Sequence, residues 1–111
     1  MTDLHTVVET QGYIVDADDA GMDETDRAAV VDQVAKKPDG GDNLGAGLYK
    51  VRVARPGMGK RGGWRVLVGY VSKKLPAYLL AVFAKNDKDN LSKKDIEALE
   101  GVMKDIKKTA K

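Results

Sequence analysis

Residues 48–71 read LYKVRVARPGMGKRGGWRVLVGYV and contain two runs in which polar and apolar residues alternate, a pattern typical of half-buried strands. In the first run, Tyr49, Val51 and Val53 alternate with Lys50 and Arg52. Successive side chains of a strand point to opposite sides of the sheet, so these two sets must separate. The first strand is therefore expected to present an apolar side to a core and a basic side to solvent.

The second run divides in the same way, because Trp64, Val66, Val68 and Tyr70 share one side and Arg65 points to the other. A linker rich in glycine and basic residues joins the two runs, and a short connection of this kind favours an antiparallel hairpin. We therefore expect Trp64 to lie in the core. The basic side chains of both strands should share one exposed side of the sheet.

The flanking segments extend the hairpin to an α+β fold: an N-terminal strand and two helices, an antiparallel β-sheet and a C-terminal helix, in a single domain over residues 1–111. Asp23 can cap a helix and Pro38 would end it. The glycine-rich residues 40–47 are expected to form a loop. The remaining elements are expected at 5–9 (strand), 11–20 (short helix or loop), 23–37 (helix), 48–54, 64–72 and 77–84 (strands), and 92–108 (helix).

Length and composition exclude several classes of protein. The 111 residues suffice for one modest core, and the absence of cysteine excludes disulfide frameworks, thiol nucleophiles and thiolate zinc sites. His5 is the one histidine, so a histidine metal cluster is excluded too, and no metal or cofactor is expected. The N-terminal residues lack the features of a signal peptide, and the longest apolar run, 77–84, is too short to span a bilayer. We expect a cytoplasmic protein that does not contact membranes.

The charge is divided along the chain. Residues 1–47 carry a net charge of −8, and residues 48–111 carry +10. Between residues 48 and 86 there are nine basic residues and no acidic one. Such a block favours a polyanion partner, above all nucleic acid, over the alternative of a solvated surface. The nine are Lys50, Arg52, Arg55, Lys60, Arg61, Arg65, Lys73, Lys74 and Lys85.

The basic strand residues suggest a division of chemical roles. Arginine stays protonated, so Arg52 and Arg65 can serve as fixed charges on a phosphate. Charges two residues apart on a strand lie about 6.6 Å from one another. Their repulsion favours a neutral amine, so Lys50 is a candidate general base.

The stretch from Gly41 to Lys108 resembles the RelE/ParE superfamily of toxins, specifically its HigB-like branch. The resemblance rests on the glycine-rich lead-in GDNLGAG (41–47), the motif ARPGMGKRGGWR (54–65), the motif AKNDKDNLS (84–92) and the helix that begins at Lys93. It implies a RelE-like fold and a toxin of a type II toxin–antitoxin system. The implied activity is that of an mRNA interferase, a metal-independent endoribonuclease that cuts messenger RNA in the ribosomal A site by attack of a ribose 2′-OH on the adjacent phosphate.

The resemblance also implies partners and site residues. The partners are a cognate helix-turn-helix antitoxin, the ribosome and messenger RNA. The working residues are Lys50 and Arg52 on the first long strand, Arg65 on the next, and Lys85 after the last. Phe83 occupies a position where close relatives often have tyrosine. Contacts to RNA or the ribosome are expected from Arg55, Lys60, Arg61, Lys73, Lys74 and Asn86.

Two other functions fit the same residues. ParE-like members of the superfamily share the fold but poison DNA gyrase by binding. A plain nucleic-acid-binding module would use the basic side of the sheet without chemistry. A small helix-turn-helix protein in the adjacent reading frame would favour a toxin over such a module, and mapping of transcript ends would distinguish cutting from binding.

Overall fold

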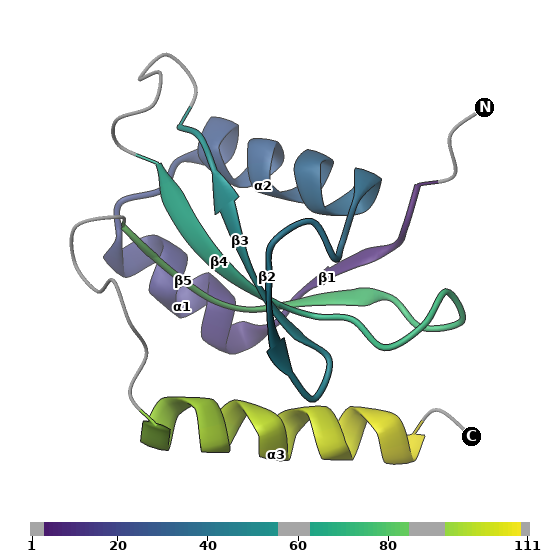
Figure 1. Cartoon of the computed structure of the whole chain (residues 1–111). Helices are drawn as coiled ribbons and strands as arrows, with labels where there is room; N and C mark the ends of the chain where they lie inside the picture. Colours follow the sequence, from purple (N-terminus) through teal and green to yellow (C-terminus); the bar gives the residue numbers. More distant parts are fainter. Residues whose placement is uncertain (1–3, 56–62, 85–92, 110–111) are drawn as a thin grey trace.

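A computed structural model describes residues 4–55, 63–84 and 93–109, and its eight elements form a three-layer α+β arrangement (Figure 1). The expected fold class is confirmed. The elements in chain order are β1 (Val7–Glu9), α1 (Gln11–Asp19), α2 (Glu24–Lys36), β2 (Asp42–Gly45), β3 (Leu48–Val53), β4 (Trp64–Gly69), β5 (Ala77–Ala84) and α3 (Lys93–Thr109).

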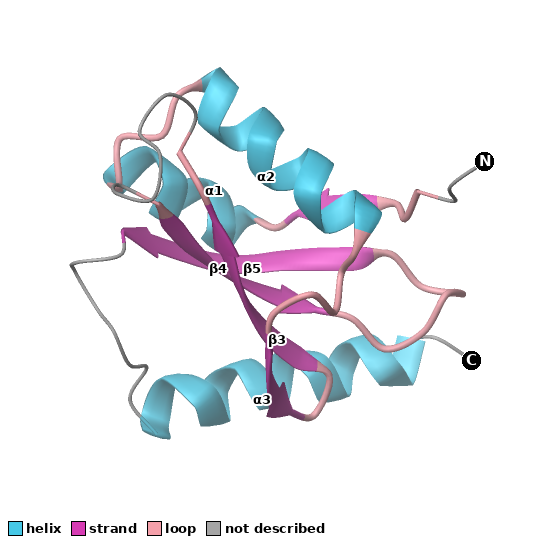
Figure 2. Cartoon of the chain, turned by 45° about the horizontal axis from the view of Figure 1, so that its top comes forward, coloured by secondary structure: helices cyan, strands magenta, loops and turns pink. Residues whose placement is uncertain are grey.

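The five strands form one sheet in the order β1-β5-β4-β3-β2. Neighbouring strands from β2 to β5 are antiparallel, whereas β1 joins the edge of β5 in parallel, so the sheet is mixed. Thr10, at the end of β1, donates its backbone N–H and its hydroxyl to the carbonyl oxygen of Leu79. Helices α1 and α2 cover one face of the sheet and α3 lies on the other (Figure 2).

The expectation of a loop at residues 40–47 was wrong, because residues 42–45 form the edge strand β2. A tight turn through Gly45, Ala46 and Gly47, all with positive φ, connects β2 to β3. Four residues of mixed polarity are too few to show an alternating pattern, and β2 pairs on one side alone. Its strand conformation comes from backbone pairing with β3, which residue types do not reveal.

The two N-terminal helices have clear start signals. Asp23 and Asp26 form a capping box at the start of α2, in which each side chain accepts a hydrogen bond from the other residue's backbone N–H. Thr10 caps α1, so the segment 11–20, which fitted a helix or a loop, is helical over residues 11–19. No helix in the described part of the chain is long and apolar enough to cross a bilayer.

The main core lies between the sheet and helices α1 and α2. As expected, Val51 and Val53 of β3 are buried there with Trp64, Val66 and Val68 of β4. The helices contribute Tyr13, Ala17, Val30 and Val34 to the same cluster. The apolar sides predicted for both strands are therefore confirmed.

The other face of the sheet holds a second, smaller core that the sequence analysis did not anticipate. Leu48, Leu67 and Leu80 pack there against Met103 of α3, and all four are buried. The sulfur of Met103 occupies the space that a Cβ on Gly69 would fill. The expected exposed basic side is therefore covered by α3 over part of its length, and one methionine in a glycine-lined hollow anchors this helix.

Met103→Ala should lower the free energy of unfolding by about 2–5 kcal/mol, because it removes a buried side chain and leaves a cavity. The neighbouring Val102→Ala should change it by less than about 0.5 kcal/mol, since Val102 is 42% exposed. Urea unfolding followed by circular dichroism measures both. Equal effects of the two substitutions would contradict the assignment of Met103 as the anchor.

Tyr13 provides a second test of the main core. Its hydroxyl is buried and has no hydrogen-bond partner among the described residues. Burial, reinforced by the charge of Glu9 and opposed by Arg27, raises the pKa of Tyr13 from 10.0 to about 12. The folded state therefore keeps the phenolic proton to a higher pH than the unfolded state does.

The folded protein should consequently lose stability as the pH rises from 10 toward 12, because unfolding then releases a proton from Tyr13. Tyr13→Phe removes this contribution and leaves an equally apolar ring. We expect urea unfolding of both proteins at pH 8 and pH 11 to show that the free energy of unfolding of the variant, relative to that of the wild type, is higher at pH 11 than at pH 8. A stability difference that is the same at both pH values would contradict the burial of this phenol.

Candidate nucleic-acid interface

Two arginines and an aromatic ring form a row across the sheet. Arg52 of β3 lies directly opposite Arg65 of β4, and Arg65 lies directly opposite Phe83 of β5. Cβ atoms of directly opposed residues are about 4.5–5.5 Å apart, and their side chains share a face. Since Val51 and Val53 point to the main core, this row faces the other way, as expected for the basic side.

Lys50 lies one step along β3 on the same face, between two different neighbours. It is paired across the sheet with Asp42 of β2 on one side and with Leu67 of β4 on the other. Leu67 is buried in the small core beneath α3. Lys50 therefore marks the border between the part of the face that α3 covers and the part that remains open.

Lys50, Arg52 and Arg65 line a shallow hollow of about 270 Å³ together with Asp42 and the backbone of Gly40 and Gly41. Within the described ranges, the three basic side chains form no ion pair. Guanidinium groups recognise phosphate oxygens through two parallel hydrogen bonds, and an ammonium adds a point charge. The hollow can therefore hold a phosphate group.

Two contacts fix the backbone of the hollow, one from α2 and one from Gly41. Gln33 of α2 donates from Nε2 to the carbonyl oxygen of Arg52 at 2.8 Å, at the part of β3 that β2 does not reach. Gly41 approaches β3 so closely that a Cβ there would collide with the carbonyl oxygen of Lys50. A side chain at position 41 would thus push the start of β2 away from β3.

Arg55, which was expected to contact RNA or the ribosome, makes two contacts within the protein. Its Nε lies 3.3 Å from Oδ1 of Asp26, a carboxylate that is 3% exposed, and its guanidinium lies 5.4 Å from the ring centre of Trp64. Trp64 is buried in the main core, as predicted. The structure therefore ties Arg55 to α2 instead of bringing it to the hollow.

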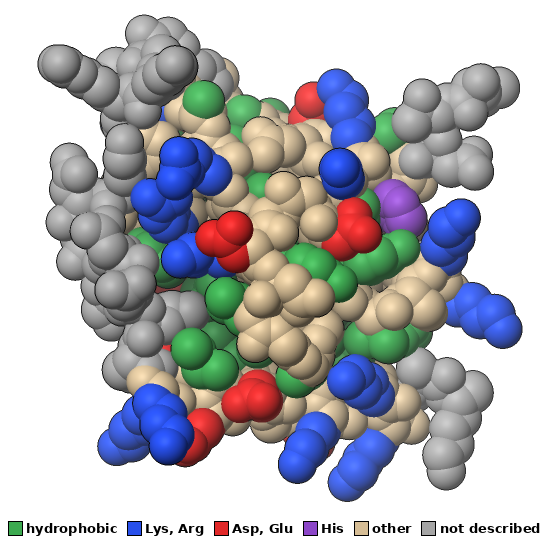
Figure 3. All heavy atoms as spheres, in the orientation of Figure 1, with side chains coloured by type: hydrophobic (Ala, Val, Ile, Leu, Met, Phe, Trp, Pro, Cys, Tyr) green, Lys and Arg blue, Asp and Glu red, His purple; other side chains and the backbone are tan. Residues whose placement is uncertain are grey.

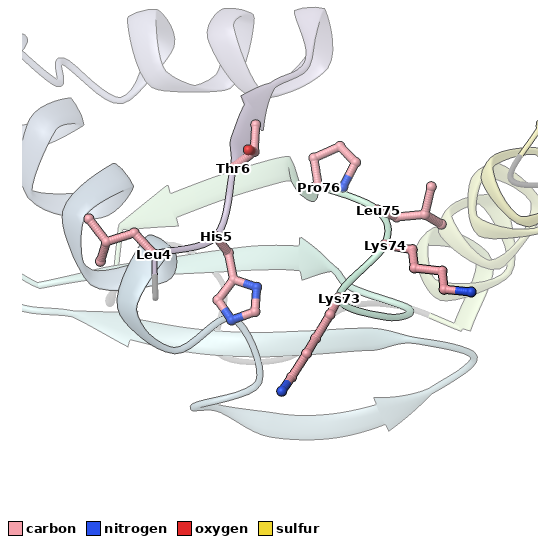
Figure 4. Close-up of a pocket in the computed structure, with 7 residues that line it drawn as sticks. All are labelled: Leu4, His5, Thr6, Lys73, Lys74, Leu75 and Pro76. Atoms are coloured by element: carbon pink, nitrogen blue, oxygen red, sulfur yellow. The ribbon is translucent and has the colours of Figure 1, made fainter. Parts of the chain in front are cut away.

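Lys73 and Lys74 belong to the β4–β5 connection, at the end of β4 away from Arg65. They line a separate pocket with residues 4–6, 75 and 76 (Figure 4). The ring of His5 also packs edge-to-face against that of Tyr70. The side chains of His5 and Lys73 point to the same side of this pocket, whereas Lys74 points away from it (Figure 4). The two lysines are exposed but do not join the hollow.

Four of the expected site residues, Lys60, Arg61, Lys85 and Asn86, lie outside the described residues. On the face seen in Figure 3, Lys and Arg side chains gather along the margins, with acidic side chains between them. The hollow thus brings together three of the predicted residues: Lys50, Arg52 and Arg65.

Three further residues lie at the site without having been predicted there from the sequence: Asp42, Gln33 and Phe83. Phe83 could have been placed by counting alternate residues along β5, since its side chain points away from the main core and is half-buried. Asp42 and Gln33 come from the acidic N-terminal segment, and their positions depend on how β2 and α2 pack against β3.

Arg55→Ala should lower the free energy of unfolding by about 1–2 kcal/mol, because it removes an ion pair and a cation–π contact from a partly exposed side chain. Arg52→Ala, which removes an exposed guanidinium without an ion pair to a described residue, should change it by less than about 0.5 kcal/mol. Urea unfolding measures both. The reverse order of effects would contradict the roles assigned to these arginines.

Comparison with known protein families is consistent with this geometry. Residues 16–111 match the family model described as the RelE toxin of the RelE / RelB toxin-antitoxin system. The match begins within α1, so it leaves out β1 and includes α2, strands β2 to β5, the hollow and α3. The chain therefore belongs to the RelE toxin family of toxin–antitoxin systems.

Proposed function

We propose that this protein is a HigB-like mRNA interferase that cuts messenger RNA held in the ribosomal A site and so inhibits translation. The observation that carries this proposal is the cross-strand pair Arg52 and Arg65, which with Lys50 lines one hollow and forms no ion pair within the described ranges. Membership of the RelE toxin family supports it. In this proposal a single domain over residues 1–111 carries the activity, and it acts in the cytoplasm.

The chemistry needs fixed positive charge and positioning. Attack of the 2′-OH on the adjacent phosphate builds two negative charges on the phosphorus oxygens, and Arg52 and Arg65 would stabilise them. Both arginines are attached to hydrogen-bonded strands, so little ordering is required when the substrate binds. Lys85, which directly follows β5 in the sequence, would act at the phosphate.

Phe83 supports recognition of an unstacked base. Its half-buried ring lies beside Arg65 in the row across the sheet. Single-stranded RNA is commonly bound by stacking a base on an aromatic ring while cations hold the adjacent phosphate. The row therefore suits one nucleotide, with its base on Phe83 and its phosphate on the arginines.

The remaining basic residues would enlarge the contact with the ribosome. Lys73 and Lys74 lie at the far end of β4, so they would contact RNA well away from the hollow. The others that we assign to this contact are Arg55, Lys60, Arg61 and Asn86.

A helix-turn-helix antitoxin would silence the toxin by covering the hollow with an acidic segment. Residues 48–111 carry a net charge of +10, so a negatively charged surface of the antitoxin would be complementary to them in the inactive complex. Complementary charge mainly accelerates association and makes the rate sensitive to salt.

The test is to incubate purified protein with a defined transcript, with and without programmed ribosomes, and to map the 5′ ends. We expect cutting only with ribosomes, because free RNA seldom places its 2′-OH in line with the phosphate. Arg65→Ala should slow cutting at least about 10²-fold, as loss of one donor to a developing oxyanion does. Lys107→Ala, which removes an exposed charge from α3, is the matched control and should cut normally.

Absence of cutting in both mixtures, with ribosome binding retained, would contradict the nuclease and favour a non-catalytic binding module. Inhibition of DNA gyrase by the same preparation would instead favour the ParE-like function. Thermal melts of both variants establish that a lost activity does not reflect unfolding.

A further inference from the structure

The hollow contains three side chains that are hydrogen-bond donors without an acceptor. They are Arg52, Arg65 and Lys50, which can stabilise negative charge or donate a proton. A carboxylate is an acceptor and can take a proton. Among the six described residues that line the hollow, Asp42 supplies the only carboxylate.

Asp42 precedes the basic residues 48–86 in the sequence, and the fold places it beside them in the hollow. It lies on the edge strand β2 and is the direct cross-strand partner of Lys50, so the two side chains share the open face. Asp42 is exposed, and within the described ranges it forms no ion pair. Its oxygens are therefore open to a ligand in the hollow.

The close approach of Gly41 holds this carboxylate in place. Because the backbone of Gly41 lies against the carbonyl of Lys50, the position of Asp42 relative to β3 is fixed by a contact that any side chain at 41 would disturb. A general base must lie within hydrogen-bond reach of the proton that it removes, so this backbone contact matters for chemistry.

We propose that Asp42 is the general base of the RNA cleavage, an inference that rests on the proposed function. An Oδ of Asp42 takes the proton of the ribose 2′-OH as the 2′-oxygen forms its bond to phosphorus. The bond between phosphorus and the 5′-oxygen then breaks, and that oxygen takes a proton from the ammonium of Lys50. The products are a 2′,3′-cyclic phosphate and a 5′-hydroxyl end, and both side chains regain their protonation states from water.

This assignment differs from the one expected from sequence. Lys50 was expected to serve as a base because neighbouring cations would favour its neutral amine. In the structure its cross-strand partner on β2 is the carboxylate of Asp42, a group that can itself accept a proton. Lys50 therefore suits the acid role and Asp42 the base role.

The experiment measures single-turnover cleavage at saturating programmed ribosomes. Asp42→Asn keeps the size of the side chain but removes its basicity, so we expect the rate to fall by about 10²-fold or more, with ribosome binding unchanged. Asp42→Glu should retain part of the activity. Asp39→Asn, the same change at an exposed site that does not line the hollow, should cut at the wild-type rate.

A second substrate separates the two proton transfers. In a transcript with sulfur in place of the 5′-bridging oxygen, the leaving group departs without a proton. This substrate should restore cutting by Lys50→Ala and should not restore cutting by Asp42→Asn. Restoration of Asp42→Asn, or wild-type cutting of the ordinary transcript by that variant, would overturn the proposal.

The outcomes also separate this inference from the proposed function. A wild-type protein that leaves the transcript intact on ribosomes would overturn both. A wild-type protein that cuts, together with an Asp42→Asn variant that cuts equally well, would overturn the role of Asp42 alone. Thermal melts and ribosome sedimentation show whether each variant is folded and bound.

Discussion

Side-chain alternation along β3 is the constraint on which both the core and the hollow depend. One set of residues faces helices α1 and α2, and the other set, Leu48, Lys50 and Arg52, runs from apolar to basic along the opposite face. Leu67 and Arg65 of β4 repeat the same change from apolar to basic. Helix α3 can therefore pack only at the apolar end, and its position leaves the basic end open.

The open end carries a cost in stability that a purely structural sheet would avoid. Arg52 and Arg65 are direct cross-strand partners, and two like charges in this arrangement destabilise a sheet. For comparison, a favourable cross-strand pair stabilises a sheet by about 0.2–1 kcal/mol. The fold accommodates the pair because both strands are buried on their other side and because Gln33 completes the edge of β3 beside Arg52. A repulsive pair held on rigid strands is what a phosphate site requires, since the ligand then supplies the missing negative charge.

The sequence predicted those features that depend on local periodicity. The two sides of β3 and β4, the Asp23 cap of α2 and the grouping of Lys50, Arg52 and Arg65 all follow from alternation and spacing. Features that depend on packing between distant parts of the chain were not predicted from the sequence. Strand β2 is set by pairing and not by residue type, and the small core requires knowing that Met103 fits the space above Gly69. Arg55 belongs to the same basic block in the sequence as Arg52 and Arg65, but only the structure reveals its ion pair with the buried Asp26.

The division of charge along the chain takes on a different meaning once β2 is in place. Among the described residues that line the hollow, the N-terminal segment contributes one carboxylate, Asp42, and the other charged groups are three cations. Before reaction the four groups carry a net charge of +2. When Asp42 accepts the proton of the 2′-OH, the charge around the phosphorus rises to +3 just as the phosphate oxygens acquire their second negative charge. Proton transfer to Asp42 would thus strengthen the attraction of the hollow for the transition state more than its attraction for the bound RNA. An interaction that is stronger in the transition state than in the bound substrate accelerates the reaction.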